Sequence, residues 1–411
     1  MPSRRRLLAG VGVGAVGITG SESVLDDGLR TSIGIASAAE SAEVDWPMAR
    51  YDAAGTGFNP DASGPKGEPR IAWEGTFDRT GGFGMGPPIL ADGTVYASTE
   101  ELVAFDATTG DVRFSYGDAH RFSSPAHVPS SIYRTDTLAV AAPGEIVGLN
   151  AGGGLKLFGR RVGDERWKSP VGESGFDFFG PTEAPPPVTV DGTVYSVVPE
   201  TSDVVALEAD SGRERWRRTV EYSDIASEAL RRPAVRDGTV FVTAWPHQLR
   251  AFDAETGDEE WRDELDEQMV LAPTATDGAV VVLTRSGVTT YEADGSDVRW
   301  KRDLEGNATE GAAAVADGTV FVADSNQSLH ALDLETGDEE WSVSFATPTT
   351  PVVADGVVYV TNGAEIIAFD AETGDELFAY ESEWTFSPPA VGDGVLYAVD
   401  GDRLLALEGS A

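Results

Sequence analysis

The side chains that most often carry chemistry are scarce in this chain. It has no cysteine and four histidines, His120, His127, His247 and His330. The lack of cysteine excludes disulfides, thiol nucleophiles and cysteine-ligated zinc. The histidines stand far apart, and none belongs to a metal-binding spacing such as H-E-x-x-H. We therefore expect no catalytic residue, no cofactor-binding residue and no metal ligand.

Serine and aspartate patterns lead to the same expectation. Residues 172–175 read Gly-Glu-Ser-Gly, which lacks the G-x-S-x-G spacing of a nucleophile elbow. Aspartate-rich turns such as residues 253–258, Asp-Ala-Glu-Thr-Gly-Asp, lack the ligand order and the closing glutamate of an EF-hand loop. These turns recur along the chain, so we interpret them as elements of the fold.

The elements that would position a site come from one unit, repeated eight times. Asp-Gly precedes an apolar strand seven times, and Asp136-Thr137 begins a degenerate eighth copy. Each unit continues with a second apolar run, a Thr-Gly turn and a strand that carries an aromatic residue. Repeats of this length indicate one supersecondary unit per copy. The seven Asp-Gly copies begin at Asp92, Asp191, Asp237, Asp277, Asp317, Asp355 and Asp393.

The repeated unit predicts small antiparallel sheets. Asp-Gly between apolar strands favours a two-residue hairpin, because both residues adopt positive φ. Several strands, such as residues 357–360, Val-Val-Tyr-Val, are apolar on both faces, so both faces must be covered. A 38-residue unit leaves no room for four strands and a helix, so the sheets must cover one another. We therefore predict an all-β, eight-bladed β-propeller of four-stranded antiparallel blades.

The chain ends predict how the ring closes. The last unit lacks its outermost strand, and residues 70–73, Arg-Ile-Ala-Trp, supply one with its aromatic residue in register. We expect this N-terminal strand to pair into the last blade, which removes exposed sheet edges. The predicted organisation is an export signal at 1–38, a lead-in segment at 39–68 and the propeller at 69–411.

The repeats resemble those of the PQQ-like (pyrroloquinoline quinone) propeller family. Residues 317–341, DGTVFVADSNQSLHALDLETGDEEW, carry the resemblance most clearly, and residues 45–60 resemble the family's lead-in. The family includes quinoprotein dehydrogenases and the BamB-type assembly factor. The dehydrogenase branch implies PQQ over the ring axis with calcium and a catalytic aspartate, but no position here matches its ligands. The BamB-like branch implies a non-catalytic scaffold that docks peptides or protein loops.

Irregular segments at one rim of the expected ring carry aromatic residues. They are the connections into blades 1, 3 and 8 and the Trp245-Pro246-His247 connection of blade 4. Variable loops on a rigid ring often bind partners, but these aromatics could instead plug the axis or pack between blades. An insertion at residues 152–161 could contact an acidic partner or be a flexible, degenerate turn. The candidate binding rim comprises Phe83, Met85, Phe176, Phe178, Phe179, Trp245, His247, Trp384 and Phe386.

Charge and the N-terminus predict the environment. The chain has 69 acidic and 30 basic residues and a formal net charge of −39, which argues against a nucleic-acid partner. Only four of the basic residues are lysines, and such a composition resembles proteins of halophilic archaea.

Residues 3–8, Ser-Arg-Arg-Arg-Leu-Leu, resemble a twin-arginine signal, followed by an apolar run too short to span a membrane. We expect export to the cell surface or medium, with a possible tether through an uncleaved leader and possible glycosylation at Asn307 or Asn326.

The sequence thus favours a non-enzymatic exported scaffold that binds a protein or peptide partner at the cell surface. The alternative is a PQQ-dependent sugar or alcohol dehydrogenase, for which PQQ and calcium would be the cofactors. No residue identifies the partner or the oligomeric state.

Overall fold

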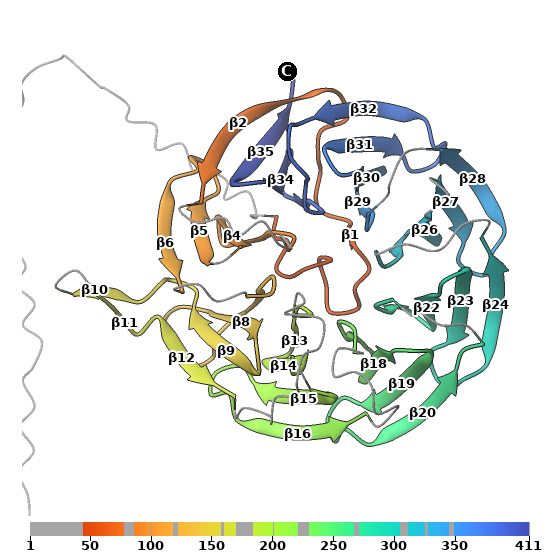
Figure 1. Ribbon diagram of the computed structural model, residues 1–411, viewed down its shortest axis with the longest axis horizontal. Helices are drawn as coiled ribbons and strands as arrows, with labels where there is room; N and C mark the ends of the chain where they lie inside the picture. The colour runs from red at the N-terminus through yellow and green to blue at the C-terminus, as the bar shows by residue number, and fades with distance from the viewer. Residues whose placement is uncertain are drawn as a thin grey trace, which may run out of the picture. The chain divides into compact units, whose positions relative to one another are not determined.

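The chain forms a closed ring of β-sheets around a central axis (Figure 1). The computed structural model describes residues 44–77, 86–99, 101–117, 122–157, 160–169, 184–199, 201–220, 230–266, 271–304, 311–324, 328–344 and 349–410. These residues form eight four-stranded antiparallel blades and no helix, so the predicted eight-bladed propeller is confirmed. They accordingly contain no helix with the length and apolarity needed to cross a membrane. The predicted leader, residues 1–38, lies outside them, as do Asn307 and Asn326.

In each blade the strands follow one another in sequence order from the axis outward, except that β2 is the outermost strand of blade 8. Blades 1 and 2 contain β3 (Ile89–Ala91), β4 (Thr94–Ser98), β5 (Leu102–Asp106) and β6 (Val112–Tyr116), then β7 (Ala126–Val128), β8 (Thr137–Ala142), β9 (Glu145–Asn150) and β12 (Glu165–Lys168). Blades 3 and 4 contain β13 (Val188–Val190), β14 (Thr193–Val197), β15 (Asp203–Glu208) and β16 (Glu214–Thr219), then β17 (Ala234–Arg236), β18 (Thr239–Ala244), β19 (Gln248–Asp253) and β20 (Glu259–Glu264).

The second half of the ring repeats this order. Blades 5 and 6 contain β21 (Thr274–Thr276), β22 (Ala279–Leu283), β23 (Gly287–Glu292) and β24 (Val298–Asp303), then β25 (Ala314–Ala316), β26 (Thr319–Asp324), β27 (Ser328–Asp333) and β28 (Glu339–Ser344). Blades 7 and 8 contain β29 (Val352–Ala354), β30 (Val357–Thr361), β31 (Glu365–Asp370) and β32 (Glu376–Glu381), then β33 (Ala390–Val391), β34 (Val395–Asp400), β35 (Arg403–Gly409) and β2 (Pro69–Thr76).

The first and last strands of the propeller blades in chain order meet in blade 8. Strand β2 pairs antiparallel with β35, in the register Ile71 to Leu407 and Trp73 to Ala406. The N-terminal strand therefore completes the last blade, as the sequence predicts. A closed ring of this kind leaves no end blade with an unpaired edge.

The repeated turns hold their shape through aspartate side chains. In the turn after β19, Asp253 Oδ1 accepts hydrogen bonds from the backbone N–H groups of Glu255 and Thr256, at 3.1 and 2.7 Å. Gly257 follows with φ +72°, a left-handed conformation that favours glycine. The Asp-Gly hairpins also adopt the expected geometry, since Asp237 and Gly238 have φ of 49° and 83°.

Tryptophans on the outer strands of six blades join each of those blades to the next. The Trp216 Nε1–H of blade 3 donates a 2.9 Å hydrogen bond to the Ala254 carbonyl of blade 4. A Cβ on Gly257 would lie 2.6 Å from Trp216 Cδ2, so the indole packs directly on this glycine. The same bond recurs at Trp73, Trp167, Trp261, Trp300 and Trp341. The apolar cores likewise lie between neighbouring blades, since one buried cluster joins Phe321 of blade 6 to Val358 of blade 7.

Residues 44–63 form a belt inside the ring that the sequence did not predict. They pass along the innermost strands of successive blades, as the loop at the centre of Figure 1 shows. Backbone N–H groups of these strands donate to belt carbonyls, including Val235 to Ala53 at 2.8 Å and Ala275 to Ala54 at 2.9 Å. The belt includes β1 (Phe58–Asn59), which pairs parallel with β29. It therefore supplies hydrogen bonds to inner-strand groups that face the axis.

Blade 2 departs from the repeat at the insertion. Residues 155–162 form a separate hairpin of β10 (Leu155–Leu157) and β11 (Arg160–Val162), which pair antiparallel with each other. The hairpin projects outward from the ring (Figure 1). The blade itself keeps four strands, β7, β8, β9 and β12. The insertion therefore adds an arm without breaking the propeller.

Candidate functional site

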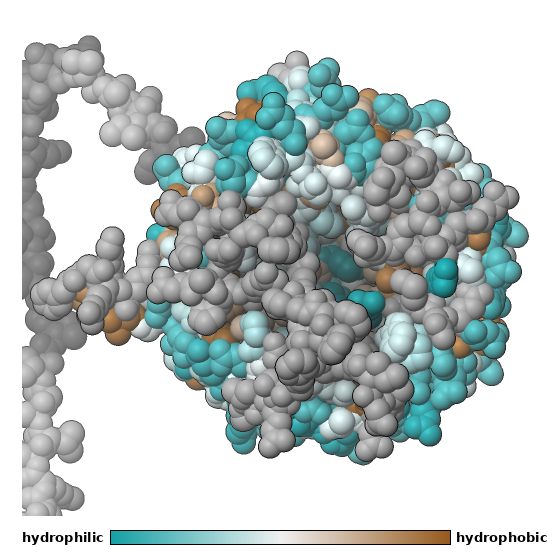
Figure 2. All heavy atoms as spheres, viewed as in Figure 1, coloured by the Kyte–Doolittle hydropathy of each residue, from teal (hydrophilic) through white to brown (hydrophobic). Residues whose placement is uncertain are grey.

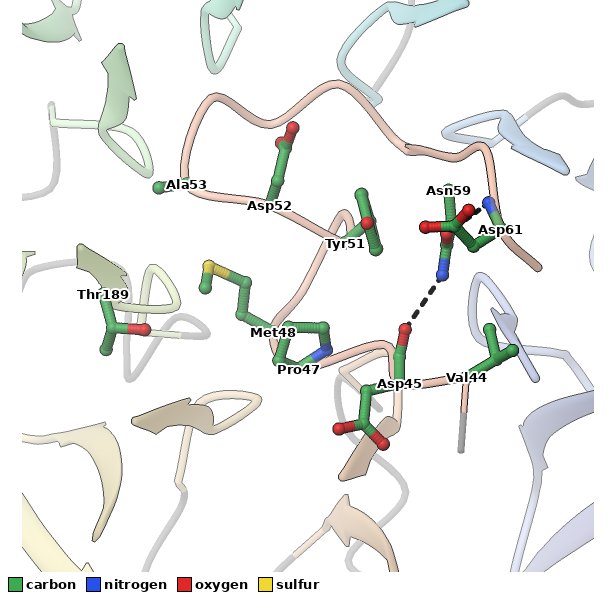
Figure 3. Close-up of a pocket in the computed structure, with 10 residues that line it drawn as sticks. All are labelled: Val44, Asp45, Pro47, Met48, Tyr51, Asp52, Ala53, Asn59, Asp61 and Thr189. Carbon is green, nitrogen blue, oxygen red and sulfur yellow. Dashed lines mark hydrogen bonds between the residues drawn. The ribbon is translucent and has the colours of Figure 1, made fainter. Parts of the chain in front are cut away.

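The belt and the inner strand of blade 3 line an open cavity of about 760 Å³ at the axis (Figure 3). Its lining includes three carboxylates, from Asp45, Asp52 and Asp61, together with Met48 and Tyr51. Asn59 fixes the lining by donating a 2.9 Å hydrogen bond to the Asp45 carbonyl. The Asp52 carboxylate accepts from the Thr56 N–H and hydroxyl, at 2.8 and 2.9 Å. The cavity is thus acidic and rigidly built.

This acidic cavity does not fit PQQ. PQQ carries carboxylates of its own, so the carboxylates that line the cavity would repel it unless a cation lay between them. Within the described ranges, Asp45, Asp52 and Asp61 do not converge closely enough to hold a metal ion together. We therefore derive no step through PQQ at this cavity.

Two buried arginines anchor the belt to the inner strands. Arg50 Nε donates to the Gly55 carbonyl at 2.8 Å, and its Nη1 donates to the Ala312 carbonyl at 3.2 Å. Arg232 Nη2 donates to the carbonyls of Ala49 and Asp52, at 2.9 and 2.7 Å. Burial lowers the pKa of Arg50 to about 9, with a further contribution from the Arg232 charge, and burial lowers the pKa of Arg232 to about 10. Both side chains serve structure, because their hydrogen bonds go mainly to backbone carbonyls.

The four rim residues that the structure describes lie in two connections on opposite sides of the ring. Trp245 and His247 are partly buried in the connection between β18 and β19 of blade 4, whereas Trp384 lies in the connection into blade 8, across the ring. Trp384 is 57% exposed and packs against Gly401. Phe386 is a correction to the predicted rim, since it is 3% exposed, lies in the core and contacts Tyr380. Phe83, Met85, Phe176, Phe178 and Phe179 lie outside the described residues.

Exposed apolar side chains gather on blade 2 instead. Of nine large apolar side chains that are exposed in the described part of the chain, five belong to this blade. Figure 2 shows hydrophobic atoms on the projecting arm. Gathered apolar exposure of this kind marks interaction surfaces more often than scattered single residues do. The blade 2 apolar surface consists of Ile132, Tyr133, Leu155, Leu157 and Val162.

Contacts fix the connection that carries Ile132 and Tyr133 to the body of blades 2 and 3. Ile132 and Tyr133 lie in the connection between β7 and β8, and the Arg166 guanidinium stacks over the Tyr133 ring at 4.2 Å. The Ser130 and Ser131 hydroxyls donate to the Asp210 carboxylate of blade 3, at 2.6 and 2.7 Å. Thr135 donates to Asn150 Oδ1 at 2.7 Å, beside the base of the hairpin. The connection is therefore fixed next to the arm.

Sequence reasoning raised the insertion as a contact for an acidic partner, but it did not predict an apolar surface on blade 2. The insertion at 152–161 departs from the repeat and carries three of the chain's 30 basic residues. Leu155 and Leu157 alternate with Lys156, as in a half-exposed strand. Its pairing as a hairpin could have been predicted from the glycines at both ends. The long connection that exposes Ile132 gives no comparable signal.

The histidines have separate settings. His120 lies outside the described residues. His330 bridges two carboxylates with its two ring nitrogens, since Nδ1 lies 3.0 Å from Glu339 and Nε2 lies 3.1 Å from Asp324. It is therefore a packing and ion-pair residue within blade 6. His127 lies 8% exposed between two carboxylates of blades 1 and 2.

The fold and the repeats define the class of protein as a PQQ-like repeat propeller. A family described as outer membrane protein assembly factor BamB matches residues 68–158, 151–282, 224–349 and 284–410. These matches together cover most of the chain, so the chain belongs to this family.

Individual relatives match over parts of their length. BamB of Moranella endobia is 28% identical over 204 residues, which cover 46% of this chain and 51% of that protein. BamB of Yersinia pestis is 26% identical over 241 residues, covering 52% of this chain and 60% of that protein. The serine/threonine-protein kinase AfsK of Streptomyces griseus is 33% identical over 178 residues, covering 40% of this chain and 22% of that protein. The aligned regions thus span less than two thirds of these relatives.

Solved structures share the fold. BamB from Moraxella catarrhalis has a TM-score of 0.64 at 13% identity, covering 83% of this chain and all of that chain. The quinohemoprotein alcohol dehydrogenase of Comamonas testosteroni has a TM-score of 0.66 at 14% identity, covering 89% of this chain and 81% of that chain. Because an assembly factor and a dehydrogenase share this ring, the likeness indicates the fold and not the activity.

Proposed function

We propose that this protein is a non-enzymatic scaffold, exported from the cytoplasm, that binds a protein partner through the blade 2 apolar surface. Membership of the BamB family supports a binding role, since relatives in it are named as assembly factors. The observation that carries the proposal is the concentration of exposed apolar side chains on one blade. Leu155, Leu157 and Val162 are 69%, 50% and 54% exposed on a two-stranded arm.

The arm suits an extended partner segment. A two-stranded sheet leaves unpaired N–H and C=O groups on its outer edges, and such edges accept an added strand. Main-chain hydrogen bonds would then provide affinity, and the apolar side chains would provide specificity. We expect the partner segment to be apolar and acidic, because the inserted residues 152–161 include three basic residues in an otherwise acidic chain.

Capture from the envelope and secreted fractions of the source cells, in molar salt, tests the proposal. The variant Val162→Ser is compared with Val298→Ser, whose valine is 50% exposed on β24, away from the arm. The proposal expects a protein that the unmodified chain and Val298→Ser retain and Val162→Ser loses. Equal retention by both variants would contradict docking at blade 2, and loss only in Trp384→Ala would place the partner at the rim.

The same preparation tests the enzymatic alternative. Titration with PQQ and calcium, followed by absorbance and by dye reduction with sugars or alcohols, should give neither saturable binding nor turnover. Saturable PQQ binding with turnover would replace the scaffold proposal with the dehydrogenase.

A further inference from the structure

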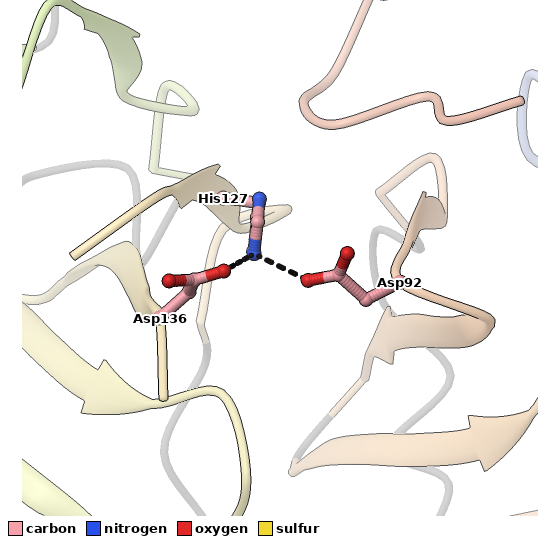
Figure 4. A group of neighbouring side chains, drawn as sticks. All are labelled: Asp92, His127 and Asp136. Atoms are coloured by element: carbon pink, nitrogen blue, oxygen red, sulfur yellow. Dashed lines mark ion pairs between the residues drawn. The ribbon is translucent and has the colours of Figure 1, made fainter. Parts of the chain in front are cut away.

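The junction of blades 1 and 2 brings one histidine and two carboxylates together (Figure 4). His127 lies on β7, Asp92 lies in the turn between β3 and β4, and Asp136 directly precedes β8. One ligand atom from each of the three lies within 4.8 Å of the others. The three side chains come from three separate segments, so the junction itself assembles the group.

Both carboxylates converge on the same ring nitrogen. His127 Nε2 lies 3.3 Å from Asp136 Oδ2 and 3.5 Å from Asp92 Oδ2. One nitrogen carries at most one proton, so it cannot donate a well-aligned hydrogen bond to both oxygens. Distances of 3.3 to 3.5 Å are also long for a hydrogen bond between charged groups. His330 shows the contrasting arrangement, in which each ring nitrogen faces its own carboxylate. The two carboxylates at a single nitrogen of His127 are therefore not explained by hydrogen bonding to the ring.

The same distances fit three ligands around a cation. Zinc binds histidine nitrogen and carboxylate oxygen at about 2.0–2.2 Å, which in a tetrahedral site separates neighbouring ligand atoms by roughly 3.3–3.6 Å. The two separations measured from Nε2 fall in this range. Asp92 is exposed, so water has access to the remaining coordination position.

Hydrogen bonds fix one ligand carboxylate and the backbone of the other two ligands. The Ser130 N–H donates to Asp136 Oδ1 at 2.8 Å, which leaves Oδ2 directed at the histidine, as outer partners do in metal sites. The backbone N–H of Asp92 donates to Asp45 Oδ1 at 3.1 Å, and the backbone N–H of His127 donates to the Pro47 carbonyl at 2.8 Å. The belt thus holds the backbone of both the histidine strand and the aspartate turn.

We propose that Asp92, His127 and Asp136 form a binding site for a divalent transition-metal cation of the zinc type. One imidazole and two carboxylates are a ligand set that suits zinc, cobalt and manganese better than calcium or magnesium, which prefer oxygen ligands alone. The bound ion joins blade 1, blade 2 and, through their hydrogen bonds, the belt. The site borders the blade 2 apolar surface, because Asp136 ends the connection that carries Ile132 and Tyr133. Its three ligands come from this chain alone, so cation binding does not require a docked partner.

Cobalt(II) binding to the full chain tests the site. The chain is treated with a chelator, dialysed into molar KCl with excess Ca²⁺ to occupy weak acidic sites, and titrated with Co²⁺ while its visible absorption is followed. The proposal expects saturation at one Co²⁺ per chain, displacement by Zn²⁺ and a higher melting temperature with Zn²⁺.

Matched variants assign the ligands. Asp92→Asn is the most informative, because asparagine tolerates the φ of 48° at this turn and so keeps the backbone intact. Asp92→Asn and His127→Gln should each weaken Co²⁺ binding by at least about tenfold, the smallest loss typical of changes around a metal site. His330→Gln should bind as the unmodified chain does. Absence of saturable binding, unchanged affinity in Asp92→Asn, or an equal loss in His330→Gln would each overturn the site.

Discussion

The Trp73 Nε1–H donates a 2.9 Å hydrogen bond to the Ala107 carbonyl, across the junction between the last blade and the first. Trp73 belongs to the strand that the N-terminal part of the chain contributes to blade 8, and Ala107 follows the last residue of β5. The bond that joins blades 3 and 4 is therefore repeated at the point where the ring closes. Closure uses the same contact as every other tryptophan junction.

Loss of one junction tryptophan should destabilise the ring markedly. Trp216 is 5% exposed and combines a hydrogen bond with packing on Gly257, so Trp216→Ala should lower the free energy of unfolding by about 3–5 kcal/mol. Trp384→Ala, at a 57% exposed residue, should cost less than about 1 kcal/mol. Denaturant unfolding in molar salt measures the free energy of unfolding of both variants. Similar losses in the two would show that the tryptophans between blades contribute no more stability than an exposed tryptophan.

Two glycines with similar φ distinguish the cost of a left-handed backbone from the cost of a steric clash with Trp216. Gly257 and Gly356 have φ of 72° and 73°, but only a Cβ at Gly257 would meet the Trp216 ring. Gly356→Ala should cost about 1–2 kcal/mol from the left-handed conformation alone. Gly257→Ala should cost about 1–3 kcal/mol more, because the indole must move. If thermal unfolding gives the two variants equal stability, the packing of indole on glycine contributes little.

Acid should destabilise the ring through its turn carboxylates. Hydrogen bonds from Arg113 and from Arg213 lower the pKa of Asp106 and of Glu208 to about 2, from ordinary values of 3.8 and 4.5. A folded-state pKa below the unfolded one gives stability that is present above the unfolded pKa and is lost as the pH falls toward the folded value. The melting temperature should therefore fall between about pH 5 and pH 2.

Variants at the arginines test this assignment. The double variant Arg113→Gln and Arg213→Gln should show a shallower dependence of melting temperature on pH across that range in molar KCl. A slope equal to that of the unmodified chain would assign acid unfolding to other carboxylates.

Removal of the belt should weaken the ring without changing its blades. A chain that lacks residues 1–62 leaves the inner-strand N–H groups of Val235, Ala275, Val315 and Val353 without their belt carbonyls. Its melting temperature should fall, and a synthetic peptide of residues 42–66 should restore it in part. A truncated chain as stable as the full chain would show that water replaces the belt at no cost.

Dilute buffer should unfold the protein if the acidic surface is an adaptation to salt. The net charge of −39 is screened over about 3 Å in molar salt but over roughly 30 Å at 0.01 M. Near-UV circular dichroism should therefore be lost on dialysis into dilute buffer and regained on return to molar KCl. A signal that persists at low salt would contradict the halophilic interpretation of the composition.

The sequence predicts the blades well because local chemistry repeats in them. Asp237-Gly238 and Thr256-Gly257 adopt the turns that their side chains favour, and Trp73 shows where the missing strand returns. The belt could not be predicted, since its residues bond to different blades in turn and it turns through Arg50 and Tyr51, two non-glycine residues with φ of 64° and 69°. Such conformations depend on surrounding contacts rather than on local preference.

The binding features were missed for a related reason. Asp92 and His127 meet across a blade junction, and no spacing along the chain reports that contact. The aromatic residues of the predicted rim were chosen because their segments are irregular, but irregularity does not distinguish exposed Trp384 from buried Phe386. Burial depends on how neighbouring blades pack, which local patterns do not contain.

Site-directed photo-crosslinking tests partner docking on blade 2 most directly. A photoreactive residue is placed at Leu157, on the arm, or at Val298, on β24 of blade 5, and both side chains are 50% exposed. In cells irradiated in molar salt, the Leu157 position should give one discrete crosslinked protein that the Val298 position does not give. Crosslinks of equal yield at both positions, or none at Leu157 while Trp384 gives one, would contradict docking at the blade 2 apolar surface.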